Sequence, residues 1–146
     1  MIRREVQDRQ GEGVVLSSLG QIALSRGKLD EADAYFQQSL VIRREVQDRQ
    51  GEGVDLAQLG LIARDTGQYD EAEEYFQRCL AILREVQDAL NQARILEILG
   101  AFLIEQRGNS ADGCKMLHEA ARLYDEMGVP GGDEARETAR RLGCAS

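Results

Sequence analysis

The chain has 146 residues, of which 30% are charged and 42% hydrophobic, and a formal net charge of −8. This length is enough for one domain with a hydrophobic core. The acidic balance argues against a protein that binds nucleic acid, because such proteins need clustered positive charge. It also argues against binding to anionic membrane surfaces. No apolar run approaches membrane-spanning length, and the N-terminus lacks the apolar segment of a signal peptide.

The cysteines and the histidine do not form a pattern typical of a disulfide framework, a metal site or a catalytic site. Cys79, Cys114 and Cys144 are widely spaced and odd in number, which predicts no disulfide framework and a cytoplasmic location. Cys114 and Cys144 have no partner at metal-ligand spacing, and a multi-histidine metal site is excluded because His118 is the only histidine. We expect His118 to be satisfied or exposed to solvent. The sequence therefore predicts no catalytic residue, no cofactor and no metal.

An internal repeat organises the chain. Residues 2–14 reappear letter for letter at 42–54, and Arg84-Glu85-Val86-Gln87-Asp88 repeats the connector once more. The period of roughly 40 residues falls in the range of helical solenoids. The composition also favours helix, because Ala, Leu, Glu, Gln and Arg dominate.

We expect the elements in the following order. Residues 1–8 are the partial tail of an earlier unit. Repeat 1 covers 9–48, with helices at 9–26 and 30–46, and repeat 2 covers 49–88, with helices at 49–66 and 70–86. A degenerate repeat 3 covers 89–128, with helices at 89–107 and 110–127. The capping segment 131–146 has a polar helix at 133–142, with acidic residues first and arginines last, as the helix dipole prefers.

Glycines and aspartates recur at fixed repeat positions. Glycine inside a helix costs about 1 kcal/mol relative to alanine, so we expect close helix contacts at Gly20, Gly60 and Gly100. We place the small Ala32 and Ala72 opposite these glycines, and Phe36 and Phe76 between neighbouring units. A left-handed residue is expected to end a helix at Gly27, Gly67 and Gly108. Asp48 and Asp88 are expected N-caps.

At this point the residues resemble the tetratricopeptide repeat family. The second repeat reproduces the family pattern with Leu56, Leu59-Gly60, Ala63, Gly67, Asp70-Glu71-Ala72, Phe76 and Cys79. The unit is longer than the common 34-residue repeat, as in kinesin light chains, spindle-orientation adaptors and many bacterial regulatory proteins. The resemblance implies an all-α fold, a right-handed α-solenoid of antiparallel helix pairs with a C-terminal capping helix. It also implies a protein-interaction scaffold with no enzymatic activity, and a buried packing role for Cys79.

The resemblance further implies a concave groove, lined by the first helix of each unit, that binds a peptide or helix. The residues at groove positions are Val14, Ser17, Gln21, Leu24, Ser25, Val54, Ala57, Leu61, Arg64, Asp65, Arg94, Glu97, Ala101, Ile104 and Glu105. The apolar row through Leu24, Leu61, Ala101 and Ile104 suggests a partner or a neighbouring copy. The alternative is that these are ordinary scattered surface residues.

Two other interpretations remain open. The partial unit at 1–8 suggests a regulatory fragment of a larger, perhaps bacterial, signalling protein that senses a ligand. Alternatively, the chain is a self-assembling structural module. Solenoid ends usually need a polar cap, and the N-terminal end has only Ile2 and Val6 among charges. That end therefore predicts a homodimer, with a two-fold contact as the simplest closed form.

Overall fold

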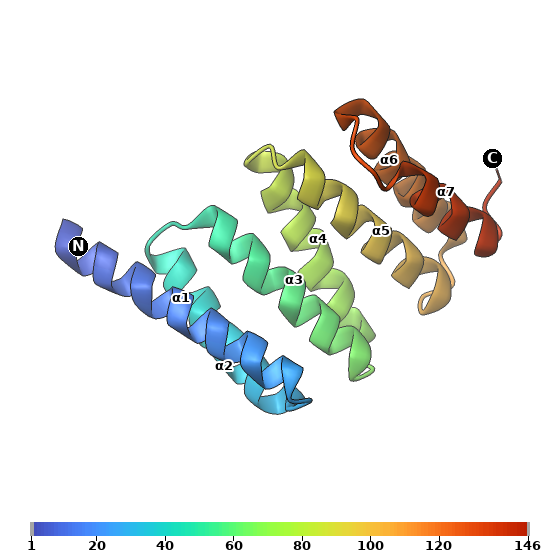
Figure 1. Cartoon of the computed structure of the whole chain (residues 1–146). Helices are drawn as coiled ribbons and strands as arrows, with labels where there is room; N and C mark the ends of the chain where they lie inside the picture. The colour runs from blue at the N-terminus through green and yellow to red at the C-terminus, as the bar shows by residue number, and fades with distance from the viewer. Residues whose placement is uncertain (1, 146) are drawn as a thin grey trace. The chain divides into compact units, whose positions relative to one another are not determined.

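The computed structural model describes residues 2–145, and the regular structure in this part of the chain is helical (Figure 1). The helices are α1 (Arg3–Ser25), α2 (Leu29–Glu45), α3 (Arg49–Asp65), α4 (Tyr69–Glu85), α5 (Ala89–Glu105), α6 (Ser110–Met127) and α7 (Gly132–Arg141). The bounds of α2 to α7 lie within two residues of the predicted ranges. The chain forms two compact units, residues 1–82 and residues 83–146, with the boundary inside α4.

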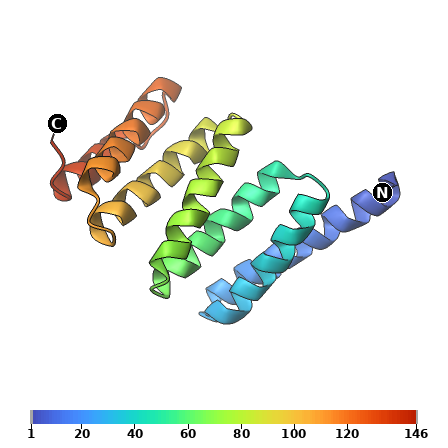
Figure 2. The ribbon, with the colours of Figure 1, turned by 180° about the vertical axis from the view of Figure 1, so that it is seen from behind.

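In the first unit, the helices pair as α1 with α2 and α3 with α4, and each pair runs antiparallel (Figures 1 and 2). Gly27 and Gly67 join the paired helices with φ of 72° and 79°, which confirms the predicted left-handed turns. A Cβ at Gly20 would lie 2.8 Å from the Phe36 ring, and one at Gly60 would lie 2.6 Å from the Phe76 ring. The predicted close contacts are therefore confirmed.

The partners of these glycines differ from the prediction. The Phe36 and Phe76 rings pack against the glycine of their own helix pair. Ala32 and Ala72 are fully buried, but neither is among the atoms nearest to the glycines. The physical reason is size, because a helical glycine leaves a hollow that a flat aromatic ring fills better than a methyl group.

The connectors between helix pairs contain a left-handed glutamine followed by a capping aspartate. Gln47 and Gln87 adopt φ of 61° and 59°, at the place where the turns within the helix pairs have glycine. The following aspartates cap the next helices: Asp48 accepts from the Gly51 amide at 2.9 Å, and Asp88 accepts from the Asn91 amide at 3.1 Å. Both predicted N-caps are confirmed.

The N-terminal segment differs from the prediction. Residues 3–8 continue α1, which has 23 residues, whereas α2 to α5 have 17 each. They do not form the tail of a separate second helix. A non-glycine residue in the left-handed conformation costs roughly 1–2 kcal/mol. Packing of the following helix offsets this cost where the chain turns back. Residues 3–8 instead continue the helix without a turn.

In the second unit, α5 packs against α6, and α6 packs against α7. A Cβ at Gly100 would lie 2.9 Å from the Gly113 carbonyl oxygen, so the predicted close contact is confirmed in this degenerate repeat. Gly108 has φ of 65°, as expected for a helix end. Helix α7 buries Ala135 and Ala139.

The second unit also corrects the prediction about cysteines. Cys114, in the first turns of α6, forms a disulfide with Cys144, which follows α7, with a Cα–Cα distance of 5.6 Å. The two residues are 30 positions apart, and they meet because α7 runs back toward the start of α6. Disulfides persist in oxidising compartments. The cysteine pattern therefore does not support the cytoplasmic location predicted from it.

Candidate partner-binding face

The first unit exposes matching apolar side chains on the first helices of its two repeats. Val14 on α1 and Val54 on α3 occupy the same repeat position and are 52% and 45% exposed. Helices α1 and α3 are neighbours, because the Ser17 hydroxyl donates to Asp55 Oδ1 at 3.2 Å. This face, which we call the α1–α3 face, presents the predicted groove residues Val14, Gln21, Leu24, Ser25, Val54, Leu61, Arg64 and Asp65.

Polar groups flank the apolar side chains of the α1–α3 face. Leu24 and Leu61 are half-buried, whereas Gln21 and Ser25 are exposed. Arg64 Nε donates to Asp65 Oδ1 at 3.1 Å, which makes an exposed ion pair beside Leu61. An exposed pair of this kind contributes little to stability. The face therefore combines an apolar row with a polar border, as interaction surfaces commonly do.

Three predicted groove residues contact their own fold. Ser17 faces α3 through its bond to Asp55. Glu97 hydrogen-bonds to Tyr124 on α6. Ile104 fills the hollow at Gly113, where a Cβ would lie 2.5 Å from Ile104 Cγ1. Ile104 is half-buried and therefore also contributes to packing within its own helix pair.

The remaining predicted positions have less distinctive surroundings. Ala57 on α3 and Ala101 on α5 are half-buried. Arg94 is exposed, and its Nη1 lies 3.4 Å from the Asn91 side-chain oxygen. Glu105 is exposed at the end of α5. These α5 residues belong to the second unit and are considered apart from the α1–α3 face.

Sequence reasoning missed the group that holds α3 in place. Asp55 is fully buried, and its Oδ2 lies 3.7 Å from Arg43 Nε on α2 while Oδ1 accepts from Ser17 on α1. Burial raises the pKa of the Asp55 carboxyl, although the charge of Arg43 and the hydrogen bond from Ser17 oppose the rise. The available signal was one difference between near-identical repeats, because Val15 stands at the position of Asp55. The network ties α3 to both helices of the preceding pair.

The buried Tyr124 and the half-buried Glu97 form a second polar contact, in the second unit. Burial, followed by the charge of Glu97 and the hydrogen bond to it, raises the pKa of Tyr124 to about 12. Burial also raises the pKa of Glu97. Gly131 lies against the Tyr124 ring, because a Cβ built at Gly131 would be 3.0 Å from the nearest ring carbons of Tyr124. This contact joins α5 to α6 and to the turn before α7, which is a packing role.

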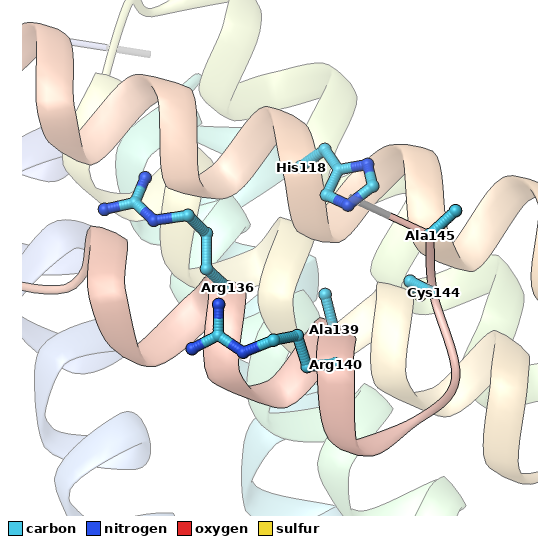
Figure 3. Close-up of a pocket in the computed structure, with 6 residues that line it drawn as sticks. All are labelled: His118, Arg136, Ala139, Arg140, Cys144 and Ala145. Carbon is cyan, nitrogen blue, oxygen red and sulfur yellow. The ribbon is translucent and has the colours of Figure 1, made fainter.

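A small pocket in the second unit contains the single histidine (Figure 3). Its volume is about 150 Å³, and it is lined by His118, Arg136, Ala139, Arg140, Cys144 and Ala145. The two guanidinium groups point away from His118 (Figure 3). Arg136 pairs with Asp125 and Asp133, both at 2.7 Å, and Arg140 pairs with Glu137. Both arginines therefore already have carboxylate partners, and His118 is exposed.

Cys79 has the predicted packing role. It is 1% exposed, and its thiol donates to the Gly53 carbonyl at 3.2 Å. Within residues 2–145 no cluster of histidine, cysteine and carboxylate side chains has the arrangement of a metal site. In the same residues, no helix combines the length and apolar character needed to cross a membrane.

Antiparallel helix pairs, joined by glycine turns and recurring about every 40 residues, define a helical-repeat protein. The tetratricopeptide repeat model matches residues 11–85, just over half of the chain. The chain belongs to the tetratricopeptide repeat family. Proteins of this family are generally protein–protein interaction scaffolds and not enzymes.

One solved structure supports the same fold, and a second is similar to the chain. The N-terminal domain of stress-induced protein-1 (STI-1) from C. elegans superposes with a TM-score of 0.70 and 12% sequence identity, over 92% of this chain and 96% of that domain. A putative kinesin light chain from Podospora anserina, with nearly identical TPR-like repeats, has a TM-score of 0.49 and 19% identity, over 89% of this chain and 72% of that one. No curated protein sequence matches the chain.

Proposed function

We propose that this chain is a scaffold that binds a peptide or an amphipathic helix of a partner protein on the α1–α3 face. The observation that carries the proposal is the paired exposure of Val14 and Val54, at 52% and 45%. Two apolar side chains at one repeat position of neighbouring helices offer two anchor points. Apolar residues left open beside a polar border commonly mark interaction sites.

The chemistry of the face indicates the kind of partner. Leu24 and Leu61 extend the apolar row, so the partner contributes an apolar stripe. The chain has a formal net charge of −8, which favours the approach of a segment with basic residues at its borders. A helix with anchors at spacings of three and four residues, or an extended peptide with alternate apolar residues, meets these requirements.

A peptide selected against the α1–α3 face tests the proposal. A displayed peptide library is selected on the parent chain, and the affinity of the recovered peptide is measured by fluorescence polarisation. Val54→Glu should weaken binding by at least about tenfold, because it places a charge in an apolar contact. The matched control is Val41→Glu on α2, at a residue 63% exposed and outside the face. Equal binding by parent and Val54→Glu contradicts the proposal.

We also propose that the chain forms a homodimer through α1. Three apolar side chains there are open to solvent: Val15 is 57% exposed, Leu19 36% and Ile22 48%. They are clustered along one side of one helix, and clustered apolar exposure favours association. Sedimentation equilibrium should show a mass of twice 16.2 kDa at high protein concentration. A monomer up to millimolar concentration contradicts this second proposal.

A further inference from the structure

We infer that two copies of the chain pair through α1 in antiparallel orientation, with Leu19 of each copy on the two-fold axis. This inference rests on the homodimer proposed above and specifies its geometry. The face concerned is the α1 stripe, which we define as Glu12, Val15, Leu19, Ile22 and Arg26. Its residues follow one another at spacings of three and four, which places them on one side of a helix.

The repeat itself shows that this stripe is a packing surface. The positions equivalent to Val15, Leu19 and Ile22 on α3 are Asp55, Leu59 and Ile62, which are 0%, 0% and 5% exposed. The α1–α2 pair covers them, as the bond from Ser17 to Asp55 shows. In the first unit α3 lies on one side of that pair, and on the other side the described residues of this unit place no helix (Figure 1). The α1 stripe is therefore the uncovered version of a surface that is buried one repeat later.

The stripe is distinct from the proposed binding face. At about 100° per residue, α1 has three sides. One side, with Gly13, Gly20 and Ala23, is buried. The α1–α3 face uses a second side, with Val14 and Gln21, and the stripe occupies the third. Two copies can therefore join through the stripe and leave the α1–α3 face open.

The chemistry at position 15 favours a second α1 over a stacked repeat. The α1–α2 pair that covers α3 presents Arg43 and Ser17. Asp55 forms an ion pair with Arg43 and accepts a hydrogen bond from Ser17. On α1 the equivalent residue is Val15, whose side chain can neither pair with a cation nor accept a hydrogen bond from a hydroxyl. Burying such polar groups without a partner is costly. The stripe therefore requires an apolar surface, and the α1 stripe of a second copy supplies one.

Charge decides the direction of pairing. The stripe begins with Glu12, whose side chain is 52% exposed, and ends with Arg26, which is also exposed. In an antiparallel pair centred on Leu19, Val15 meets Ile22 of the second copy, and Glu12 meets Arg26 of the second copy. A parallel pair instead places glutamate against glutamate and arginine against arginine. Opposite charges at the ends of an apolar seam select orientation, and the two-fold arrangement closes without forming filaments.

The first experiment locates the contact. Sedimentation equilibrium of the whole chain, from micromolar to millimolar concentration, gives the dimer dissociation constant. Val15→Asp, which copies the residue of the next repeat, should raise that constant by at least about tenfold. The matched control Val41→Asp changes an equally open valine on α2 and should leave the constant unchanged. A chain that stays monomeric, or equal effects of the two variants, overturns the inference.

The second experiment tests the orientation. Glu12→Arg and Arg26→Glu should each weaken the dimer, because each creates like charges across the antiparallel seam. The double variant, with both charges exchanged, should recover dimerisation. Glu12 also pairs with Arg9 at 2.6 Å in its own chain, so recovery in the double variant separates the contact between copies from that internal pair. A dimer that is indifferent to all three variants keeps the proposed self-association but overturns the antiparallel geometry.

A third measurement separates this inference from the scaffold function. Val15→Asp should leave peptide binding on the α1–α3 face unchanged, and Val54→Glu should leave the dimer unchanged. If Val15→Asp also abolishes peptide binding, the two faces are not independent and the assignment of the stripe is wrong. If peptide binding is never found but the dimer behaves as described, only the scaffold proposal fails.

Discussion

The Gly60 contact offers the sharpest test of the packing inside a helix pair. A Cβ at Gly60 would lie 2.6 Å from Phe76 Cε1 and 2.7 Å from Cδ1, and the Phe76 ring is fully buried. Overpacking of this kind costs roughly 1–3 kcal/mol. Replacing a helical glycine with alanine returns about 1 kcal/mol through helix propensity. Gly60→Ala should therefore change the free energy of unfolding by between about zero and 2 kcal/mol, in the destabilising direction.

Gly11 provides the matched control, because it also lies inside a helix and a Cβ there would meet nothing within 4 Å. Gly11→Ala should gain about 0.5–1 kcal/mol from helix propensity alone. The assay is urea denaturation followed by far-ultraviolet circular dichroism, with parent and both variants at one protein concentration. The difference between the two variants isolates the overpacking term, roughly 1–3 kcal/mol. Equal stabilisation by both substitutions would refute the close contact between Gly60 and Phe76.

Three further predictions concern the second unit and the buried carboxylate. Cys144→Ser removes the disulfide to Cys114. Loop-closure entropy for a separation of 30 residues predicts that the free energy of unfolding falls by up to roughly 3–4 kcal/mol. The unfolding midpoint of the variant should be lower than that of the parent, and adding reductant to the variant should not lower it further. Because the pKa of Asp55 is raised above 3.8, its favourable contribution is present at low pH and declines as the carboxyl ionises. The stability of the parent relative to Asp55→Asn should therefore fall as the pH rises from about 3.8 through the raised pKa of Asp55, and a constant difference would contradict the raised pKa. For Tyr124, with a pKa of about 12, stabilisation of the neutral form should be lost above its usual value of 10, and Tyr124→Phe should remove the tyrosinate absorbance step near pH 12.

Much of the fold follows from local signals in the sequence. Glycine at Gly27, Gly67 and Gly108 ends a helix because it enters the left-handed region without a steric cost. Asp48 and Asp88 begin the next helix because their carboxylates accept backbone amides. These effects act over a few residues, so the sequence alone predicts them. The same holds for Gly20 and Gly60, whose recurrence at one repeat position indicates a close contact without naming Phe36 or Phe76 as the partner.

The candidate site was predictable only by position. The family pattern placed Val14 and Val54 on one face, but it could not show that Ser17 bonds to Asp55 or that Ile104 fills the hollow at Gly113. Those contacts depend on which neighbouring side chain is small or polar. The distance between Cys114 and Cys144 also depends on the direction of α7, which the number and spacing of the cysteines do not predict.

Residues 2–14 and 42–54 separate the two kinds of information most clearly. Their sequences are identical, yet the first copy lies in the continuous helix α1 from Arg3 onward, whereas the second ends α2, turns at Gln47 and begins α3. The sequence by itself determined the helical character of both copies, through propensity and the apolar repeat. Only the tertiary structure decided the turn, because at 42–54 the following helix packs back onto the α1–α2 pair and Arg43 binds Asp48 at 2.6 Å. In the first copy the same residues from Arg3 onward form one uninterrupted helix.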